Sequence, residues 1–211
     1  MIKKQSLKTK ASIFVIWLFA ISGVIGISSS SQDWFLALTP LNLLLSLLIV
    51  LWNFKLFNPK IILALAIPFV LGFAAEALGV NYGIIFGNYA YGENLGFKVL
   101  GVPLIICINW TLLTIITSDI SKYLSNKIVI SSLISAALMT GLDIVLEVSA
   151  PRFDFWEFDN GMVPLQNYIA WFVTSFIANF GYQCYKVESN KIISIHVFVS
   201  ITMFFSIFLF I

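Results

Sequence analysis

The chain has 211 residues, of which 60% are hydrophobic and only 10% are charged, and its mean hydropathy is +0.98. Because soluble domains carry about a quarter charged residues, this composition predicts a polytopic membrane protein and excludes an ordinary soluble domain. The net charge of +2 is too small to indicate the basic surface that binds nucleic acid, so we expect no nucleic-acid partner.

The predicted fold class is all-α, with a polytopic membrane helical bundle of about seven transmembrane helices forming one integral membrane domain over residues 1–211. Each predicted segment is close to the roughly 17–25 apolar residues that a membrane-spanning helix needs. The segments lie near 11–28, 34–54, 61–79, 99–117, 128–147, 164–184 and 192–211. The first resembles a signal peptide, but its apolar run is longer than the usual signal core, so we expect a retained span.

The connections between these segments predict the orientation of the chain. Ten of the twelve basic residues fall on one side, and only Lys98 and Arg152 fall on the other. The ten are Lys3, Lys4, Lys8, Lys10, Lys55, Lys60, Lys122, Lys127, Lys186 and Lys191. By the positive-inside rule, we expect a multi-pass protein of the cell membrane with a cytoplasmic N-terminus and a non-cytoplasmic C-terminus.

Three acids fall inside the predicted spans, namely Glu76, Asp143 and Glu147. An acid within a membrane costs roughly 2.5–3.5 kcal/mol even on insertion scales, so each one needs a reason to be there. Glu76 and Asp143 both lie fifteen residues from the cytoplasmic start of their span, or roughly 22 Å along a helix. Glu147 lies one turn beyond Asp143 on the same helix face. We therefore expect the three carboxyl groups to converge and to be catalytic, although acids at an interface would also explain Glu76 and Glu147.

The sequence offers no intramembrane Lys or Arg to neutralise these acids, and Arg152 is the nearest cation. A carboxyl group desolvated beside another carboxylate tends to keep its proton. Pairs in which one acid is protonated and the other ionised divide the acid and base roles in catalysis.

Other chemistry-bearing residues favour plain structural interpretations. Cys107 and Cys184 lie in apolar runs without metal-ligand spacing, so we interpret them as packing residues. His196 has no acid or second His spaced to partner it, which favours a packed or interfacial histidine. No metal or cofactor is therefore expected.

Aromatic and polar side chains are dense around the two non-cytoplasmic connections, 80–98 and 148–163. An interfacial aromatic belt would explain many of them, but the cytoplasmic connections lack the same density. We expect those near the acids to contact substrate or water. The candidates are Tyr82, Phe86, Tyr89, Tyr91, Asn109, Trp110, Arg152, Trp156, Gln166, Asn167 and Trp171.

Two signatures give the chain a family resemblance. The first begins at Glu76 and reads E-A-L-G-V-N-Y-G-I-I-F-G-N-Y-A-Y-G-E-N-L-G-F-K-V-L-G-V-P-L, followed by Asn109-Trp110. The second comprises Asp143, Glu147, D-F-W-E from Asp154, and G-M-V-P-L-Q-N-Y from Gly161 to Tyr168, then Trp171. Over residues 60–185 the chain resembles the membrane carotenoid biosynthesis family that includes the CruF-type carotenoid 1,2-hydratases, although Phe155-Trp156-Glu157 stands where members usually carry a W-x-W-like pair.

The resemblance implies a cofactor-independent hydratase that adds water to the terminal 1,2 double bond of an acyclic carotenoid end group. Its implied partners are water, membrane lipid and a lipophilic substrate such as lycopene, a monocyclic carotene or a bacterioruberin precursor. A carotenoid end-group cyclase would use the same acid-initiated cation and remains an alternative. A proton-coupled transporter is an alternative from another class, because buried acids also act as proton relays.

Overall fold

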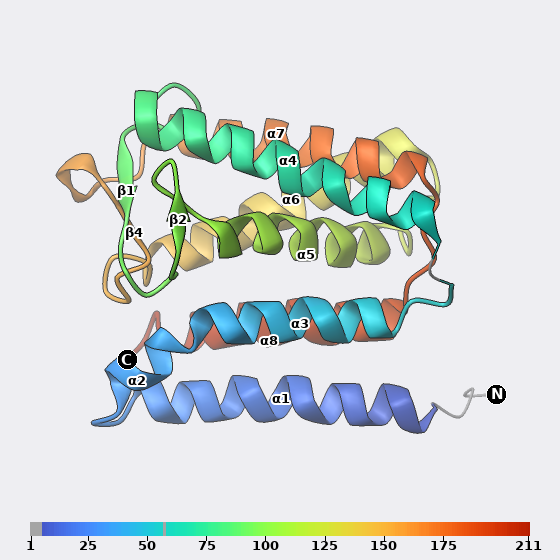
Figure 1. Ribbon diagram of the computed structural model, residues 1–211, viewed down its shortest axis with the longest axis horizontal. Helices are drawn as coiled ribbons and strands as arrows, with labels where there is room; N and C mark the ends of the chain where they lie inside the picture. Colours follow the sequence, from blue (N-terminus) through green and yellow to red (C-terminus); the bar gives the residue numbers. More distant parts are fainter. Residues whose placement is uncertain (1–5, 57) are drawn as a thin grey trace.

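The computed structural model describes residues 6–56 and 58–211 as a bundle of long helices that run in alternating directions (Figure 1). Each of the seven predicted segments contains a long helix. The helices are α1 (Leu7–Ile27), α3 (Thr39–Trp52), α4 (Pro59–Tyr82), α5 (Leu104–Ser121), α6 (Ile128–Glu147), α7 (Leu165–Cys184) and α8 (Lys191–Ile207).

Four of these helices, α1, α4, α5 and α6, are long and apolar enough to cross a membrane. The apolar helices α3 and α8 are shorter, so the number of spans remains a prediction. The predicted span 34–54 is divided into a short helix, α2 (Gln32–Ala37), and α3, with Leu38 between them. Pro40 explains the break, because proline is tolerated in the first turn of a helix and not in its interior.

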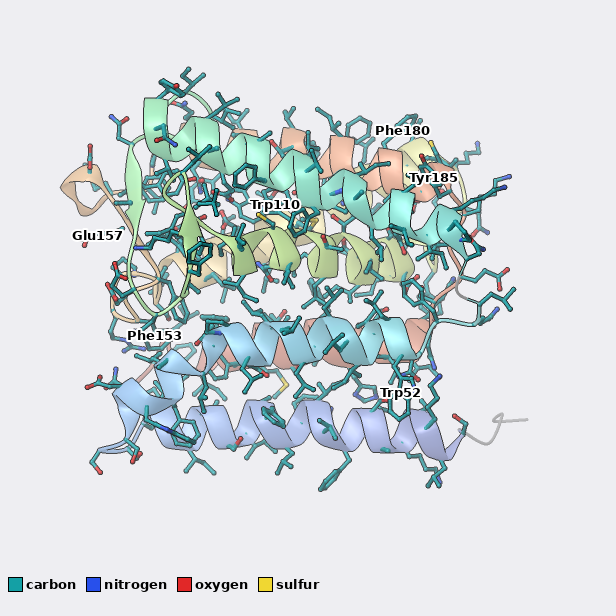
Figure 2. All side chains as sticks on the ribbon, viewed as in Figure 1. Trp52, Trp110, Phe153, Glu157, Phe180 and Tyr185 are labelled. Atoms are coloured by element: carbon teal, nitrogen blue, oxygen red, sulfur yellow. The ribbon has the colours of Figure 1, made fainter. Side chains whose placement is uncertain are left out.

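Helix α5 forms the centre of the bundle, between α4 and α7 on one side and α3 and α8 on the other (Figure 1). Trp110 of α5 is fully buried, whereas Trp52 and Phe180 are 60% and 40% exposed on outer helices (Figure 2). Outward-facing apolar side chains of this kind suit contact with lipid, because a membrane helix has no water to avoid.

At one end of the bundle, two connections pair as strands. Strand β1 (Tyr89–Tyr91) runs antiparallel to β4 (Trp156–Phe158), with Tyr89 opposite Phe158 and Tyr91 opposite Trp156. A second small sheet pairs β2 (Lys98–Val99) with β3 (Val102–Pro103). The mostly helical character that was predicted is confirmed, with two small sheets added to it. Helix α5 begins at Leu104 rather than near 99 because the β2–β3 hairpin precedes it.

The opposite end carries the basic connections. Lys55 and Glu188 form an exposed ion pair of 2.7 Å between the α3–α4 and α7–α8 connections. Lys3 and Lys4 lie outside the described residues, and the cytoplasmic assignment of this end remains a prediction. His196 accepts a hydrogen bond of 3.0 Å from Trp17, which fits the packed histidine expected from the sequence.

Both predicted packing cysteines are free. Cys107 is buried, as expected of a packing residue, whereas Cys184 is exposed. Cys184 is the last residue of α7, where the helix leaves the packed interior.

Candidate active site

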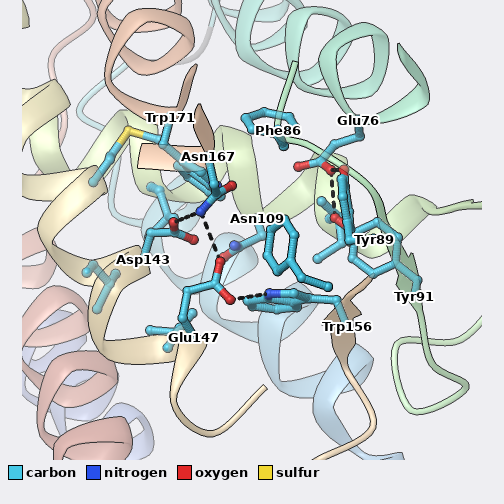
Figure 3. A pocket seen from close by; sticks show the side chains of 16 residues that line it. Glu76, Phe86, Tyr89, Tyr91, Asn109, Asp143, Glu147, Trp156, Asn167 and Trp171 are labelled. Carbon is cyan, nitrogen blue, oxygen red and sulfur yellow. Dashed lines mark hydrogen bonds between the residues drawn. The ribbon is translucent and has the colours of Figure 1, made fainter. Parts of the chain in front are cut away.

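A cavity of about 30 Å³ lies between α4, α5, α6, α7 and the paired connections (Figure 3). Glu76 enters it from α4, and Asp143 and Glu147 enter it from α6. The three carboxyl groups that the sequence placed at one depth therefore line one space. Its full lining is Glu76, Phe86, Tyr89, Tyr91, Ile106, Asn109, Leu113, Met139, Leu142, Asp143, Leu146, Glu147, Trp156, Phe158, Asn167 and Trp171.

Glu76 is only 2% exposed and accepts three side-chain hydrogen bonds. The indole nitrogen Nε1 of Trp110 donates to Oε1 at 2.9 Å, and the Tyr91 hydroxyl donates to Oε2 at 2.7 Å. The Tyr89 hydroxyl donates to the same Oε2. A buried carboxyl group is tolerated only when its oxygens are hydrogen-bonded, and these three donors supply such bonds.

The connection after α4 brings the two tyrosines to Glu76. Gly83 ends α4 with a φ of 63°, in the left-handed region that favours glycine and turns the chain back. Residues two apart in a strand point to the same face, so β1 presents Tyr89 and Tyr91 together. Burial and the adjacent Glu76 raise the pKa of both hydroxyls, which keeps them protonated as donors.

Asn167 joins the other two acids. Its amide nitrogen Nδ2 donates to Oδ2 of Asp143 at 3.0 Å and to Oε1 of Glu147 at 3.1 Å. Trp156 of β4 donates to Oε2 of Glu147 at 2.9 Å. Glu76 thus has three side-chain donors and Glu147 has two, whereas Asn167 is the one side-chain donor to Asp143 among the described residues.

Aromatic rings surround the acids. Trp110 and Trp171 stack with their ring centroids 4.4 Å apart, and Phe86 packs against both. Such rings present faces of negative potential to a cation. Asn109 lies between Glu76 and the Asp143–Glu147 pair (Figure 3), and within the described part of the chain no hydrogen-bond partner of its side chain is found. It is therefore free to hold a small polar molecule in the cavity.

Four of the residues expected to contact substrate lie outside this cavity. Trp110 is fully buried in α5 and reaches the site only through its hydrogen bond to Glu76. Tyr82 is 70% exposed at the end of α4, where the helix has passed the site. Arg152 donates to the backbone carbonyls of Phe208 and Ile211 rather than to Glu147 or Asp154. Gln166 donates to backbone carbonyls of the connection after α4, at 2.7 Å for Ile84, and so fixes that turn.

Sequence reasoning missed two parts of the structure. The apolar walls of the cavity include Leu113 and Met139, which no pattern distinguishes from ordinary core residues. It also missed Asp119, a fourth acid, which is 2% exposed within α5 and accepts hydrogen bonds of 2.5 Å from Ser189 and Ser194. Asp119 does not line the cavity, and its bonds tie α5 to the start of α8.

Gly72 lies one helical turn before Glu76 and lets Trp110 approach α4 closely. A Cβ atom at Gly72 would lie 2.5–2.8 Å from three Trp110 side-chain atoms, so Gly72→Ala must displace the indole that donates to Glu76. We expect a loss of about 1–3 kcal/mol in the free energy of unfolding, as for other overpacked cores. Thermal unfolding in detergent, followed by circular dichroism, measures this change.

Gly141→Ala is the matched control, because nothing lies within 4 Å of a Cβ atom at that α6 position. The control should unfold at the wild-type temperature or above it, since alanine favours a helix. A Gly72→Ala protein as stable as this control would contradict the close packing of Trp110 on α4.

Among the described residues, no group of three or more His, Cys, Asp or Glu side chains is placed to hold a metal ion.

The chain has no match among curated proteins or among solved structures. The model of one protein family, described as "Carotenoid biosynthesis protein", matches residues 38–211, which include all three acids of the cavity and its aromatic walls. The chain therefore belongs to the carotenoid biosynthesis protein family.

Proposed function

We propose that this protein hydrates the terminal 1,2 double bond of an acyclic carotenoid end group in the cell membrane. A carboxylic acid gives its proton to C2 of the alkene, which leaves a tertiary cation at C1. The oxygen of a bound water then bonds to C1, and a carboxylate takes the proton that this water loses. The sum of these steps is the alkene plus one water, so the reaction needs no change in oxidation state and the proposal includes no cofactor.

The proposal depends on the number of side-chain hydrogen bonds that each of the three acids accepts, which differs from one acid to the next. Hydrogen bonds from neutral donors favour the ionised form of a carboxyl group, and burial without them favours the protonated form. Asp143, with one side-chain donor, is therefore assigned the role of general acid. Glu147 has two donors and lies one turn from Asp143, so it is assigned the role of the base that takes the proton from water.

Glu76 is assigned a different role, because its three donors fix it as the most strongly compensated of the three acids. A fixed carboxylate stabilises positive charge as it develops, and it does so strongly in a dry site. The rings of Trp156, Trp171 and Tyr89, which also line the cavity, add cation–π attraction of about 2 kcal/mol or more each when desolvated. Asn109 is assigned to hold the attacking water.

The substrate class follows from the family and from the apolar surroundings of the acids. Candidate substrates are lycopene, a monocyclic carotene and a bacterioruberin precursor, all of which have an acyclic end with this double bond. Membrane lipid would deliver any of them.

Expression of the full chain in a lycopene-producing bacterium tests the reaction. We expect the extracted pigment to gain the mass of one water per hydrated end, and to gain the heavier isotope when cells grow in H₂¹⁸O. A new pigment of unchanged mass would identify a cyclase instead. If the lycopene is neither hydrated nor cyclised, the proposal is wrong for this substrate. The same experiment is then done with a monocyclic carotene.

A further inference from the structure

A second cavity of about 100 Å³ adjoins the acid cavity on the side of α1, α3 and α8. The two cavities share walls, since Asn109, Leu142 and Trp156 face both of them. The second cavity is mostly apolar, with Ile16 and Ala20 of α1 and Phe204 and Phe205 of α8 in its lining. A mostly apolar space that shares walls with the acid cavity suits a hydrocarbon attached to the reacting group.

A further cavity lies beside the second, toward the surface of the bundle. This third cavity, of about 250 Å³, shares Thr39, Asn42 and Phe204 with the second. Its outer lining includes Trp34 and Leu41, which are 62% and 54% exposed. The three cavities thus lie next to one another in a row, from the acids, between α1, α3 and α8, to an apolar surface beside α2.

Phe204 stands at the junction of the outer two cavities. It approaches the backbone of α1 so closely that a Cβ atom at Gly23 would lie 3.1 Å from the Phe204 ring. The ring is partly buried and packs on Phe205 and Phe208 of the same segment. Phe204 therefore forms part of the wall that the outer two cavities share.

We propose that the polyene tail of the carotenoid substrate occupies this row of cavities, which we call the α1–α3–α8 channel, and reaches it from lipid between α1 and α3. The inference rests on the proposed function for the identity of its occupant. The walls that α3 and α8 supply lie within the family match, whereas the wall that α1 supplies precedes it.

The rival location is a groove between α4 and α7, lined by Leu71, Ala74, Leu78, Ile169 and Val173 among others. This groove is larger, at about 700 Å³, and apolar, but it shares no lining residue with the acid cavity. A polyene lying there would not border the acid cavity, so shared walls rather than volume decide between the two locations.

Two matched substitutions separate these locations. Ala20→Phe puts a ring into the channel, and Ala74→Phe puts the same ring into the groove. The full-length variants are produced in lycopene-making cells, purified in detergent, and compared by the ratio of carotenoid absorbance to protein. We expect Ala20→Phe to retain about tenfold less pigment or lower still, because a filled site excludes its ligand. Ala74→Phe should stay within about twofold of wild type, as exposed substitutions usually do.

Wild-type pigment retention by Ala20→Phe, or its loss from Ala74→Phe alone, would overturn the channel. If Ala20→Phe is not monodisperse in detergent, Ser46→Phe on the α3 wall serves the same test with the same expected loss. Pigment retention and product mass are separate readouts. If the wild-type protein retains lycopene in the channel without hydrating it, the proposed function is wrong but the channel proposal is supported. If the wild-type protein retains no carotenoid at all, the channel proposal is wrong.

Discussion

Asp143→Asn is expected to lower the rate of lycopene hydration by about 10²–10⁴-fold, the contribution of a well-placed general acid. Asparagine has nearly the same shape and can still accept the hydrogen bond from Asn167, but it has no acidic proton to give to an alkene. The channel is untouched by this change, so pigment retention should stay at the wild-type level. Hydrated product formed per unit time in isolated membranes measures the effect.

Asp159→Asn provides the matched control, because Asp159 is an exposed acid of the same end of the bundle that does not line the cavity. It should hydrate lycopene at the wild-type rate. If Asp143→Asn turned over as fast as this control, the assignment of Asp143 as the acid would be wrong.

Glu76→Gln is expected to lower the hydration rate by about 10²–10³-fold, as is typical when one preorganised electrostatic contact is removed from a transition state. Glutamine keeps one oxygen to accept hydrogen bonds, but it carries no negative charge to stabilise the cation at C1. Its amide group would also face one of the three donors that now converge on the carboxylate, and a donor left unpaired in a buried site costs about 1–3 kcal/mol. We therefore expect a lower unfolding temperature together with the lower rate.

Glu157→Gln controls for the loss of a negative charge at this end of the protein. Glu157 is exposed on β4 and lies at the outer end of the bundle (Figure 2). The rate at saturating lycopene separates a catalytic from a merely structural role. A Glu76→Gln protein that unfolds earlier but hydrates lycopene at the rate of the Glu157→Gln control would show that Glu76 only holds the fold together.

The helices, and the convergence of the acids, were predictable because both follow from local rules. A helix rises by a fixed amount per residue, so equal counts from one membrane face placed Glu76 and Asp143 at one level. The observed cavity contains both of them. The dense aromatic residues of the two connections likewise marked the segments that pair as β1 and β4.

Other features depended on contacts that no single segment encodes. The β1–β4 register joins residues far apart in the chain, and the hydrogen bond from Asn167 to Asp143 crosses from α7 to α6. Asp119 was missed because the predicted span stopped at residue 117, whereas α5 continues to Ser121 and buries it among serines of a later segment. The roles of Arg152 and Gln166 were misjudged from charge and position, since both satisfy backbone carbonyls that only the folded chain brings near.

The nitrogen of Asn167 touches both Asp143 and Glu147, and that sharing bears on how the catalytic cycle closes. In the proposed reaction, one acid loses a proton to the polyene and its neighbour gains one from water. Two carboxyl groups hydrogen-bonded to a single nitrogen atom are near enough for the proton to return from one to the other within the site. Turnover would then exchange no net charge with the surrounding solution, and the proton-motive force would neither drive the enzyme nor be spent by it.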